Sequence, residues 1–138
     1  MKLSQTPLEI DHATRDDGTV VVRVAGRIML GDESARIESL TAQLLAEGHR
    51  KLIFDVGGVT HIDSTGIGRF IASFNQVMQA GGALMMAGAA GVVREGFRVT
   101  RLDTVFRFAP SVEAAAEKMR QPGMAPFSGQ TSVSLGTG

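Results

Sequence analysis

The feature that most constrains this chain is a junction near its middle, where an apolar run is followed by a polar segment and then by a periodic one. Residues 51–56 are mostly apolar without clean alternation, which is typical of a central strand covered on both faces. From residue 64 to about residue 80, apolar side chains recur three and four positions apart, which predicts an amphipathic helix. Its predicted apolar stripe consists of Ile67, Phe70, Ile71, Phe74, Val77 and Met78, and its predicted outer side of Arg69, Ser73, Gln76 and Gln79. A buried strand that leads into such a helix is typical of an α/β fold.

Two residue types at this junction need a local explanation. Asp63 or Ser64 can cap the helix, because a side-chain oxygen there can accept a hydrogen bond from a free amide of the first turn. Gly66 and Gly68 each cost about 0.8–1.0 kcal/mol relative to alanine inside a helix. A first turn with two glycines is therefore expected where something comes close to its backbone: a neighbouring strand, a partner protein or an anion.

The residues before the junction predict a hairpin and one helix. Residues 8–12 alternate between apolar and polar, which favours a half-buried edge strand, and the β-branched residues 19–25 are expected to form the returning strand. From Gly26 onward the chain is expected to leave the sheet. Asp32 is the predicted cap of a helix that runs to about Glu47.

The residues after the junction continue the alternation of strands and helices. The expected elements are a strand at residues 83–87, a helix at 92–99, a strand at 105–108 and a helix from a Ser111 cap to about Met119. The sequence thus predicts a single α/β domain with a mainly parallel sheet and about four helices over residues 1–119. Residues 120–138 are rich in glycine, proline, serine and threonine, so we expect a flexible tail there.

Composition argues against several classes of function. The 14 basic residues equal the 14 acidic ones, and this zero net charge argues against nucleic acid as a partner. The chain has no cysteine, so it has no disulfide and no thiolate metal site. The amino terminus lacks the apolar segment of a signal peptide, and the longest apolar stretch is far too short for a membrane span. We therefore expect a soluble, cytoplasmic protein that does not insert into a membrane.

Motifs for catalysis are missing as well. The histidines, His12, His49 and His61, lack the spacing of metal ligands. The chain has neither the Gly-x-Ser-x-Gly elbow of a hydrolase nor a lysine after a phosphate-binding glycine loop. Members of a catalytic triad normally converge from distant segments, so His61, Asp63 and Ser64 are not expected to form one. We predict no enzyme activity, no catalytic residue, no bound metal and no cofactor.

Ser64, with Asp63 before it and Thr65 after it, admits two interpretations. In the first, a residue of this group only caps the helix. In the second, Ser64 is a phosphorylation site, because a phosphate there would meet free amides and the positive end of the helix dipole. The phosphate would also add about −1.5 to −2 charge beside Asp63, which a closely packed partner would not tolerate.

Residues 54–68 resemble the signature of STAS domains, and in particular that of bacterial anti-sigma factor antagonists. In this family an apolar strand ends in aspartate, and Val-x-x-Ile-Asp-Ser-Ser/Thr-Gly-Leu-Gly then opens an amphipathic helix; the corresponding residues here are 59–68. Ile67 stands where leucine is common, and Gly57-Gly58 replace a usually larger residue. The resemblance extends over about residues 8–119 and implies a small mixed sheet packed with helices.

The resemblance also implies partner switching. In this family the unphosphorylated protein binds an anti-sigma factor that is also an ATP-dependent serine kinase, and a sigma factor is released. The kinase phosphorylates the serine after the motif aspartate, which is Ser64 here, and a PP2C-type phosphatase restores binding. Thr65 is the second choice for the phosphoacceptor. The partner-binding residues that the motif implies are Asp63, Ser64, Thr65, Gly66, Ile67, Gly68 and Arg69.

Two other functions stay open at the level of sequence. One is a STAS subunit that acts as a scaffold in a stress-signalling or lipid-transport complex and does not switch. Such subunits can lack a phosphoacceptor, whereas Ser64 is present here. The other is a small nucleotide-binding or hydrolytic domain, for which the sequence holds no motif.

Overall fold

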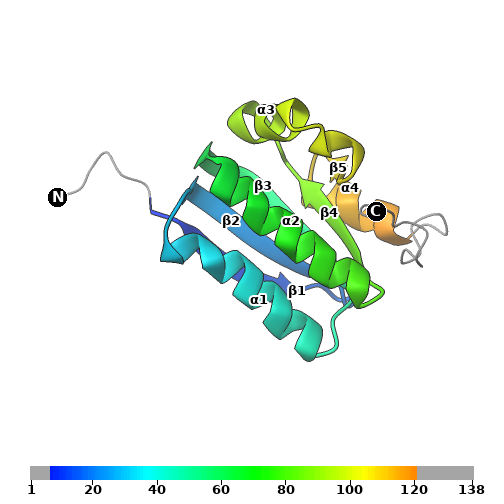
Figure 1. Cartoon of the computed structure of the whole chain (residues 1–138). Coiled ribbons are helices and arrows are strands. Elements are labelled where there is room, and N and C mark those ends of the chain that lie inside the picture. The colour runs from blue at the N-terminus through cyan, green and yellow to red at the C-terminus, as the bar shows by residue number, and fades with distance from the viewer. Residues whose placement is uncertain (1–6, 121–138) are drawn as a thin grey trace.

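Five strands form one sheet in the order of the chain, β1-β2-β3-β4-β5, in the computed structural model, which describes residues 7–120. The strands are β1 (Glu9–Thr14), β2 (Val20–Ile28), β3 (Lys51–Ile62), β4 (Ala83–Ala87) and β5 (Arg107–Ala109). β1 pairs with β2 in antiparallel fashion, and each later pair is parallel (Figure 1). The predicted mixed, mainly parallel sheet with β1 at its edge is thereby confirmed.

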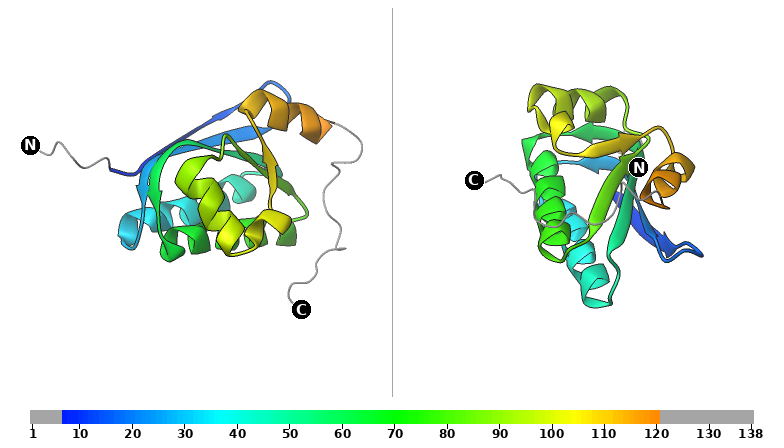
Figure 2. Two further views of the ribbon diagram at one scale, coloured as in Figure 1. Left: turned by 90° about the horizontal axis from the view of Figure 1, so that it is seen from above. Right: turned by 90° about the vertical axis from the view of Figure 1, so that its right-hand side faces the viewer.

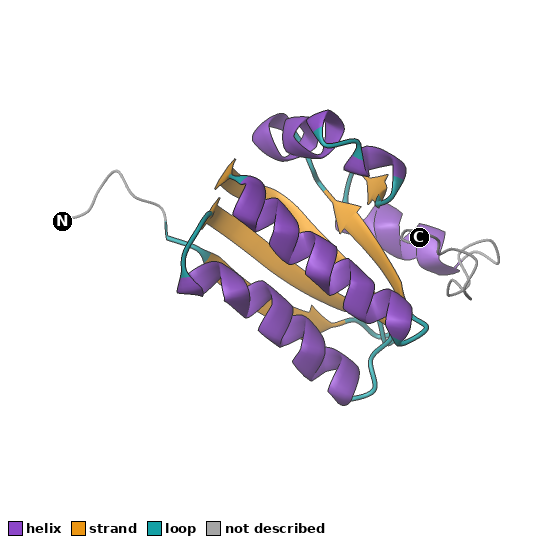
Figure 3. Cartoon of the chain, in the orientation of Figure 1, coloured by secondary structure: helices purple, strands orange, loops and turns teal. Residues whose placement is uncertain are grey.

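A helix follows each strand from β2 to β5 (Figure 3). The helices are α1 (Ala35–Ala46), α2 (Ser64–Gln79), α3 (Gly91–Val99) and α4 (Val112–Arg120), with short 3-10 helices η1 (Asp32–Ser34) and η2 (Leu102–Thr104). α1 and α2 lie side by side over one face of the sheet, whereas α4 covers the opposite face (Figure 2). α1 and α2 share a face because connections between parallel strands cross with one hand. Within residues 7–120, no helix is long and apolar enough to cross a membrane.

An apolar core lies on each face of the sheet. The larger core, under α1 and α2, takes alternate residues of two strands: Val20, Val22 and Val24 of β2, and Leu52, Phe54 and Val56 of β3. Phe70 of α2 joins it and meets Phe54 edge to face, with the ring centroids 5.4 Å apart. On the other face, Ile53 and Met85 of the sheet pack with Ala115 of α4. β3 is thus covered on both faces, as its unalternating apolar sequence predicts.

The two central strands are longer than predicted. β2 does not leave the sheet at Gly26, because a register shift beside this residue, whose φ is 88°, lets pairing continue to Ile28. β3 likewise continues beyond Val56 through the two glycines at 57 and 58 and pairs with the extended β2 up to Ile62. The first half of the junction is therefore strand rather than loop. At the other edge of the sheet, the last strand is shifted to Arg107–Ala109 from the predicted residues 105–108.

Of the N-cap residues predicted for α1 and α4, the structure confirms the one of α4 and contradicts the one of α1. Asp32 does not cap α1; it belongs to η1, and Ser34 occupies the N-cap position without a side-chain cap hydrogen bond. The Ser34 hydroxyl donates instead to the Gly31 carbonyl oxygen, at 3.0 Å. Ser111 does cap α4, since its hydroxyl oxygen accepts a hydrogen bond from the Ala114 amide at 3.1 Å.

α4 ends at Arg120, one residue into the segment that we predicted as a flexible tail. The Arg120 guanidinium forms an ion pair with Asp17 in the turn between β1 and β2, with Nη1 and Oδ2 3.3 Å apart. The rest of the predicted tail, residues 121–138, lies outside the described residues.

The predicted outer side of α2 is partly covered, because α1 packs along it. Ser73, which we placed on this side, is fully buried. Gln76 donates a hydrogen bond to the Glu38 carbonyl oxygen of α1, at 3.3 Å. Among the described residues, the buried Ser73 hydroxyl has no hydrogen-bond partner. An unpaired buried polar group of this kind destabilises the fold.

We expect Ser73→Ala to raise the free energy of unfolding by about 1 kcal/mol, because it removes the unpaired hydroxyl and introduces a better helix former. Urea unfolding followed by circular dichroism measures this change. Ser39→Ala, on the exposed side of α1, is the matched control and should gain roughly 0.5 kcal/mol or less. A less stable Ser73→Ala variant would show that the hydroxyl is not a destabilising group.

Candidate functional site

The residues of the predicted site lie at the carboxyl end of the central strand β3, where α2 begins. Ile62 is the last residue of β3, and Asp63 is the N-cap of α2. Asp63 has an extended backbone, with φ −116° and ψ −174°, and its Oδ1 accepts a hydrogen bond from the Gly66 amide at 2.9 Å. This bond satisfies an amide of the first turn that has no partner within the helix. Of the two predicted capping residues, Asp63 rather than Ser64 performs the capping.

The Asp63 carboxylate also contacts the loop between β2 and η1. Its Oδ2 accepts a hydrogen bond from the Leu30 amide at 3.0 Å, and the Asp63 amide donates to the Ile28 carbonyl oxygen at 3.3 Å. The start of α2 is thus bonded to the end of β2 and to the loop that follows it. Sequence reasoning missed Leu30, because a single apolar residue between a strand and a helix carries no signal of such a contact.

The two glycines of the first helical turn have different environments. Gly66 is buried, and a Cβ there would lie 2.3 Å from the Ile28 carbonyl oxygen and 2.9 Å from the Ile62 side chain. The neighbouring strand β2 is therefore what approaches the backbone at Gly66. A Cβ at Gly68 would meet nothing within 4 Å, so no described residue accounts for that glycine.

Gly66→Ala should lower the free energy of unfolding by about 1–3 kcal/mol, because the methyl group would overlap a backbone atom that cannot move aside easily. Gly68→Ala should instead raise it by about 0.8–1.0 kcal/mol through helix propensity alone. Urea unfolding of the two variants beside the wild type measures both effects. Equal effects of the two substitutions would contradict the close approach of β2 to Gly66.

The next residues of the site differ in their exposure. Ser64 is exposed, and no hydrogen bond within the described residues uses its hydroxyl. Thr65 is half-buried. Ile67 is 7% exposed and packs toward α3, where a Cβ at Gly96 would lie 3.0 Å from its Cδ1. The side chain at the start of α2 that is open to a second protein is therefore that of Ser64.

Arg69 connects α2 to α1 and to Ser34, the last residue of η1. Its Nη1 forms an ion pair with Glu38 Oε2 at 3.0 Å, and its Nε donates to the Ser34 hydroxyl oxygen at 3.0 Å. Ser34 in turn donates to the Gly31 carbonyl oxygen, next to Leu30. Both charged side chains of the ion pair are partly buried, so this contact is screened less than a surface pair.

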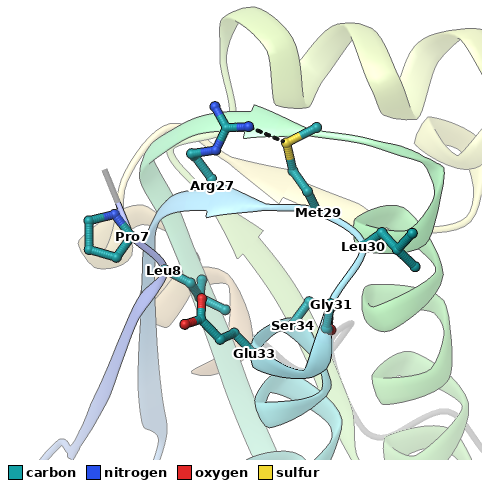
Figure 4. Close-up of a pocket in the computed structure, with 8 residues that line it drawn as sticks. All are labelled: Pro7, Leu8, Arg27, Met29, Leu30, Gly31, Glu33 and Ser34. Carbon is teal, nitrogen blue, oxygen red and sulfur yellow. Dashed lines mark hydrogen bonds between the residues drawn. The ribbon is translucent and has the colours of Figure 1, made fainter. Parts of the chain in front are cut away.

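A hollow of about 490 Å³ lies beside the Leu30 loop (Figure 4). Its lining residues are Pro7, Leu8, Arg27, Met29, Leu30, Gly31, Glu33 and Ser34. The lining carries one positive and one negative side chain, and the Arg27 guanidinium donates a hydrogen bond to the Met29 sulfur at 3.1 Å.

The histidines take no part in the hydrogen bonds that join Asp63, Arg69 and Ser34 to their neighbours. His61 lies exposed near the end of β3, where its Nδ1 is 3.0 Å from the Thr60 hydroxyl oxygen. In the part of the chain that the structure describes, no group of three or more histidine, aspartate or glutamate side chains is arranged to hold a metal ion.

Comparisons with known proteins agree on the fold and on one family. Residues 12–115 match the model of the STAS domain. BtrV of Bordetella bronchiseptica, whose name assigns it provisionally to the anti-sigma factor antagonists, is 31% identical over 103 residues, which are 72% of this chain and 85% of BtrV.

Two solved proteins share the fold. The anti-sigma factor antagonist from Mycobacterium paratuberculosis has a TM-score of 0.72 at 21% identity, covering 85% of this chain and 99% of that one. The Bacillus cell fate determinant SpoIIAA in its phosphorylated form has a TM-score of 0.62 at 19% identity, covering 83% of this chain and 100% of SpoIIAA. At these sequence identities, the two matches show that the proteins share this arrangement of strands and helices.

Proposed function

The chain belongs to the STAS domain family and, within it, to the anti-sigma factor antagonists, and from this premise we propose that it is a switch controlled by phosphorylation of Ser64. In the proposed cycle, the unphosphorylated form binds an anti-sigma factor that is also a serine kinase, and a sigma factor is freed. Phosphorylation of Ser64 by that kinase ends the binding, and a PP2C-type phosphatase restores it. The chain itself acts in the cytoplasm as a binding protein and not as an enzyme.

The observation that carries the proposal is that the Ser64 hydroxyl takes no part in capping α2. Asp63 performs the capping, and Ser64 is exposed as the first residue of the helix. A phosphate on Ser64 would therefore break no hydrogen bond of the fold. It would also lie at the positive end of the helix dipole, which favours a negative charge.

Charge and shape explain why a phosphate there would end an association. A phosphate adds about −1.5 to −2 charge beside the Asp63 carboxylate. Gly68 leaves the surface one turn further along without a side chain, so a partner can approach the helix closely. A partner packed on this surface would have to desolvate a dianion, and the fold would be unaffected. Gly66 and Ile67 are buried, so their proposed contribution to binding is to fix the position of the exposed residues around them.

Thr65 stays the second choice as phosphoacceptor. It is half-buried, whereas Ser64 is exposed, and a kinase needs the hydroxyl in its own active site. The phosphorylated form of SpoIIAA supports the proposal in one respect, because that protein has the same fold and has been solved with its phosphate. Asp63 and Arg69 contribute by fixing the loop that borders the proposed binding surface.

Incubation with ATP and a cognate anti-sigma kinase from the same genome should add one phosphate to the chain, because the exposed Ser64 hydroxyl is free to react. Mass spectrometry of the intact protein and of its peptides measures the product. Ser64→Ala should abolish the phosphorylation, and Thr65→Ala, as the matched control, should keep it. Phosphate on Thr65 would contradict the assigned site, and ATP hydrolysis by the chain alone would favour the enzymatic alternative.

Ser64→Asp should weaken binding to that kinase by roughly tenfold or more, because an unpaired charge at an interface costs several kcal/mol. Ser64→Ala should bind as the wild type does and should not be released when ATP is added. Titration calorimetry measures the affinities, and thermal unfolding checks that all three proteins are equally folded. Equal affinity of the phosphorylated and unphosphorylated wild type would instead indicate a scaffold that does not switch.

A further inference from the structure

Leu30 is the most exposed of the large apolar side chains that the structure describes. Its exposed fraction is 81%, compared with 60% for Val99 and less for Val92 and Val105. Single exposed apolar residues are common on protein surfaces and need no explanation by themselves. Leu30 differs from the others in its position, because its amide is bonded to the residue that caps α2.

The backbone of Leu30 is held on both sides although its side chain lies in solvent. On one side, the Leu30 amide donates to Asp63 Oδ2 at 3.0 Å. On the other, the carbonyl oxygen of Gly31 accepts from the Ser34 hydroxyl at 3.0 Å, and Ser34 is only 1% exposed. Ser34 also accepts from Arg69 Nε at 3.0 Å. A loop fixed in this way loses little conformational freedom when its side chain enters a binding pocket.

The surroundings of Leu30 leave room for part of a second protein. Leu30 lines the hollow, and in Figure 4 its side chain projects from the loop on the side of the α2 ribbon, whereas the Arg27 and Met29 side chains lie above β2. The hollow measures about 490 Å³. A partner that covered Leu30 would remove most of its apolar surface from water, which favours association.

We propose that Leu30 is an apolar anchor of the docking surface and that the anti-sigma factor which covers Ser64 also buries Leu30. The inference rests on the proposed function. The occupant follows from continuity, because one carboxylate, that of Asp63, bonds both the first turn of α2 and the Leu30 amide. A protein that packs closely on Ser64 extends over the adjoining loop. The partner therefore presents an apolar pocket next to the surface that rejects a phosphate.

The test compares Leu30→Ala with Val99→Ala, which truncates another exposed apolar side chain on α3, away from the Asp63 bonds. The probe is the purified kinase that phosphorylates Ser64, and titration calorimetry gives the dissociation constants. Leu30→Ala should bind at least about tenfold more weakly, whereas Val99→Ala should stay within about twofold of the wild type. Both variants should unfold at the same urea concentration as the wild type, because neither side chain is buried.

The outcomes separate this inference from the proposed function. If the wild type binds the kinase and Leu30→Ala binds equally well, the anchor is refuted while the switch stands. If no kinase of the genome binds or phosphorylates the wild type, both the proposed switch and the proposed anchor are refuted. If sedimentation finds a dimer of the wild type that Leu30→Ala abolishes, with kinase affinity unchanged, the occupant is a second copy of the chain and the proposal is overturned.

Discussion

The geometry of the site depends on one carboxylate, that of Asp63. Its two oxygens accept one hydrogen bond from the first turn of α2 and one from the loop after β2, so a single side chain fixes both the start of a helix and a neighbouring segment. A carboxylate can do this because it offers two acceptor atoms and no donor. An amide side chain has one acceptor atom, and its NH2 group would face the second backbone N–H, donor against donor.

This arrangement separates the residues that hold the fold from the residue that faces solvent. The end of β2 is joined to the start of α2 through backbone contacts of Ile28, and α1 is joined to α2 through the ion pair of Glu38 and Arg69. None of these contacts involves the Ser64 side chain. A modification of the Ser64 side chain would therefore alter the surface of the molecule without breaking any of these contacts, which is what the proposed switch requires.

Much of this fold can be predicted from sequence, and the exceptions have physical causes. The periodicity of α2 and the apolar run of β3 predict which of their residues are buried. Asp63 lies at the N-cap position of α2, where a capping side chain is expected. The extension of β2 and β3 was missed because Gly26 and Gly58 resemble breaks. In fact a Cβ at Gly58 would lie 2.9 Å from that of Ala25, so glycine there lets two strands stay paired through a bulge.

Features that depend on neighbours distant in sequence could not be predicted. The pattern of α2 places Ser73 on its outer side, but Ser73 is fully buried because α2 also packs against a neighbouring helix. The Leu30 amide bond depends on where the β2 loop lies relative to α2, which no local pattern encodes. The family motif, by contrast, identifies the stretch around Ser64 because its residues are contiguous.

The ion pair between Arg120 and Asp17 places the end of α4 beside the turn between β1 and β2. Asp17 lies in the turn before β2 starts, whereas Ser64 follows the end of β3, and the two strands run parallel. With nine residues in β2 and about 3.3 Å per residue, the two ends are roughly 25–30 Å apart. A fluorescent label on a cysteine introduced into the turn between β1 and β2 would therefore lie at the end of the sheet opposite Ser64, where it does not obstruct the approach of a large protein to the start of α2.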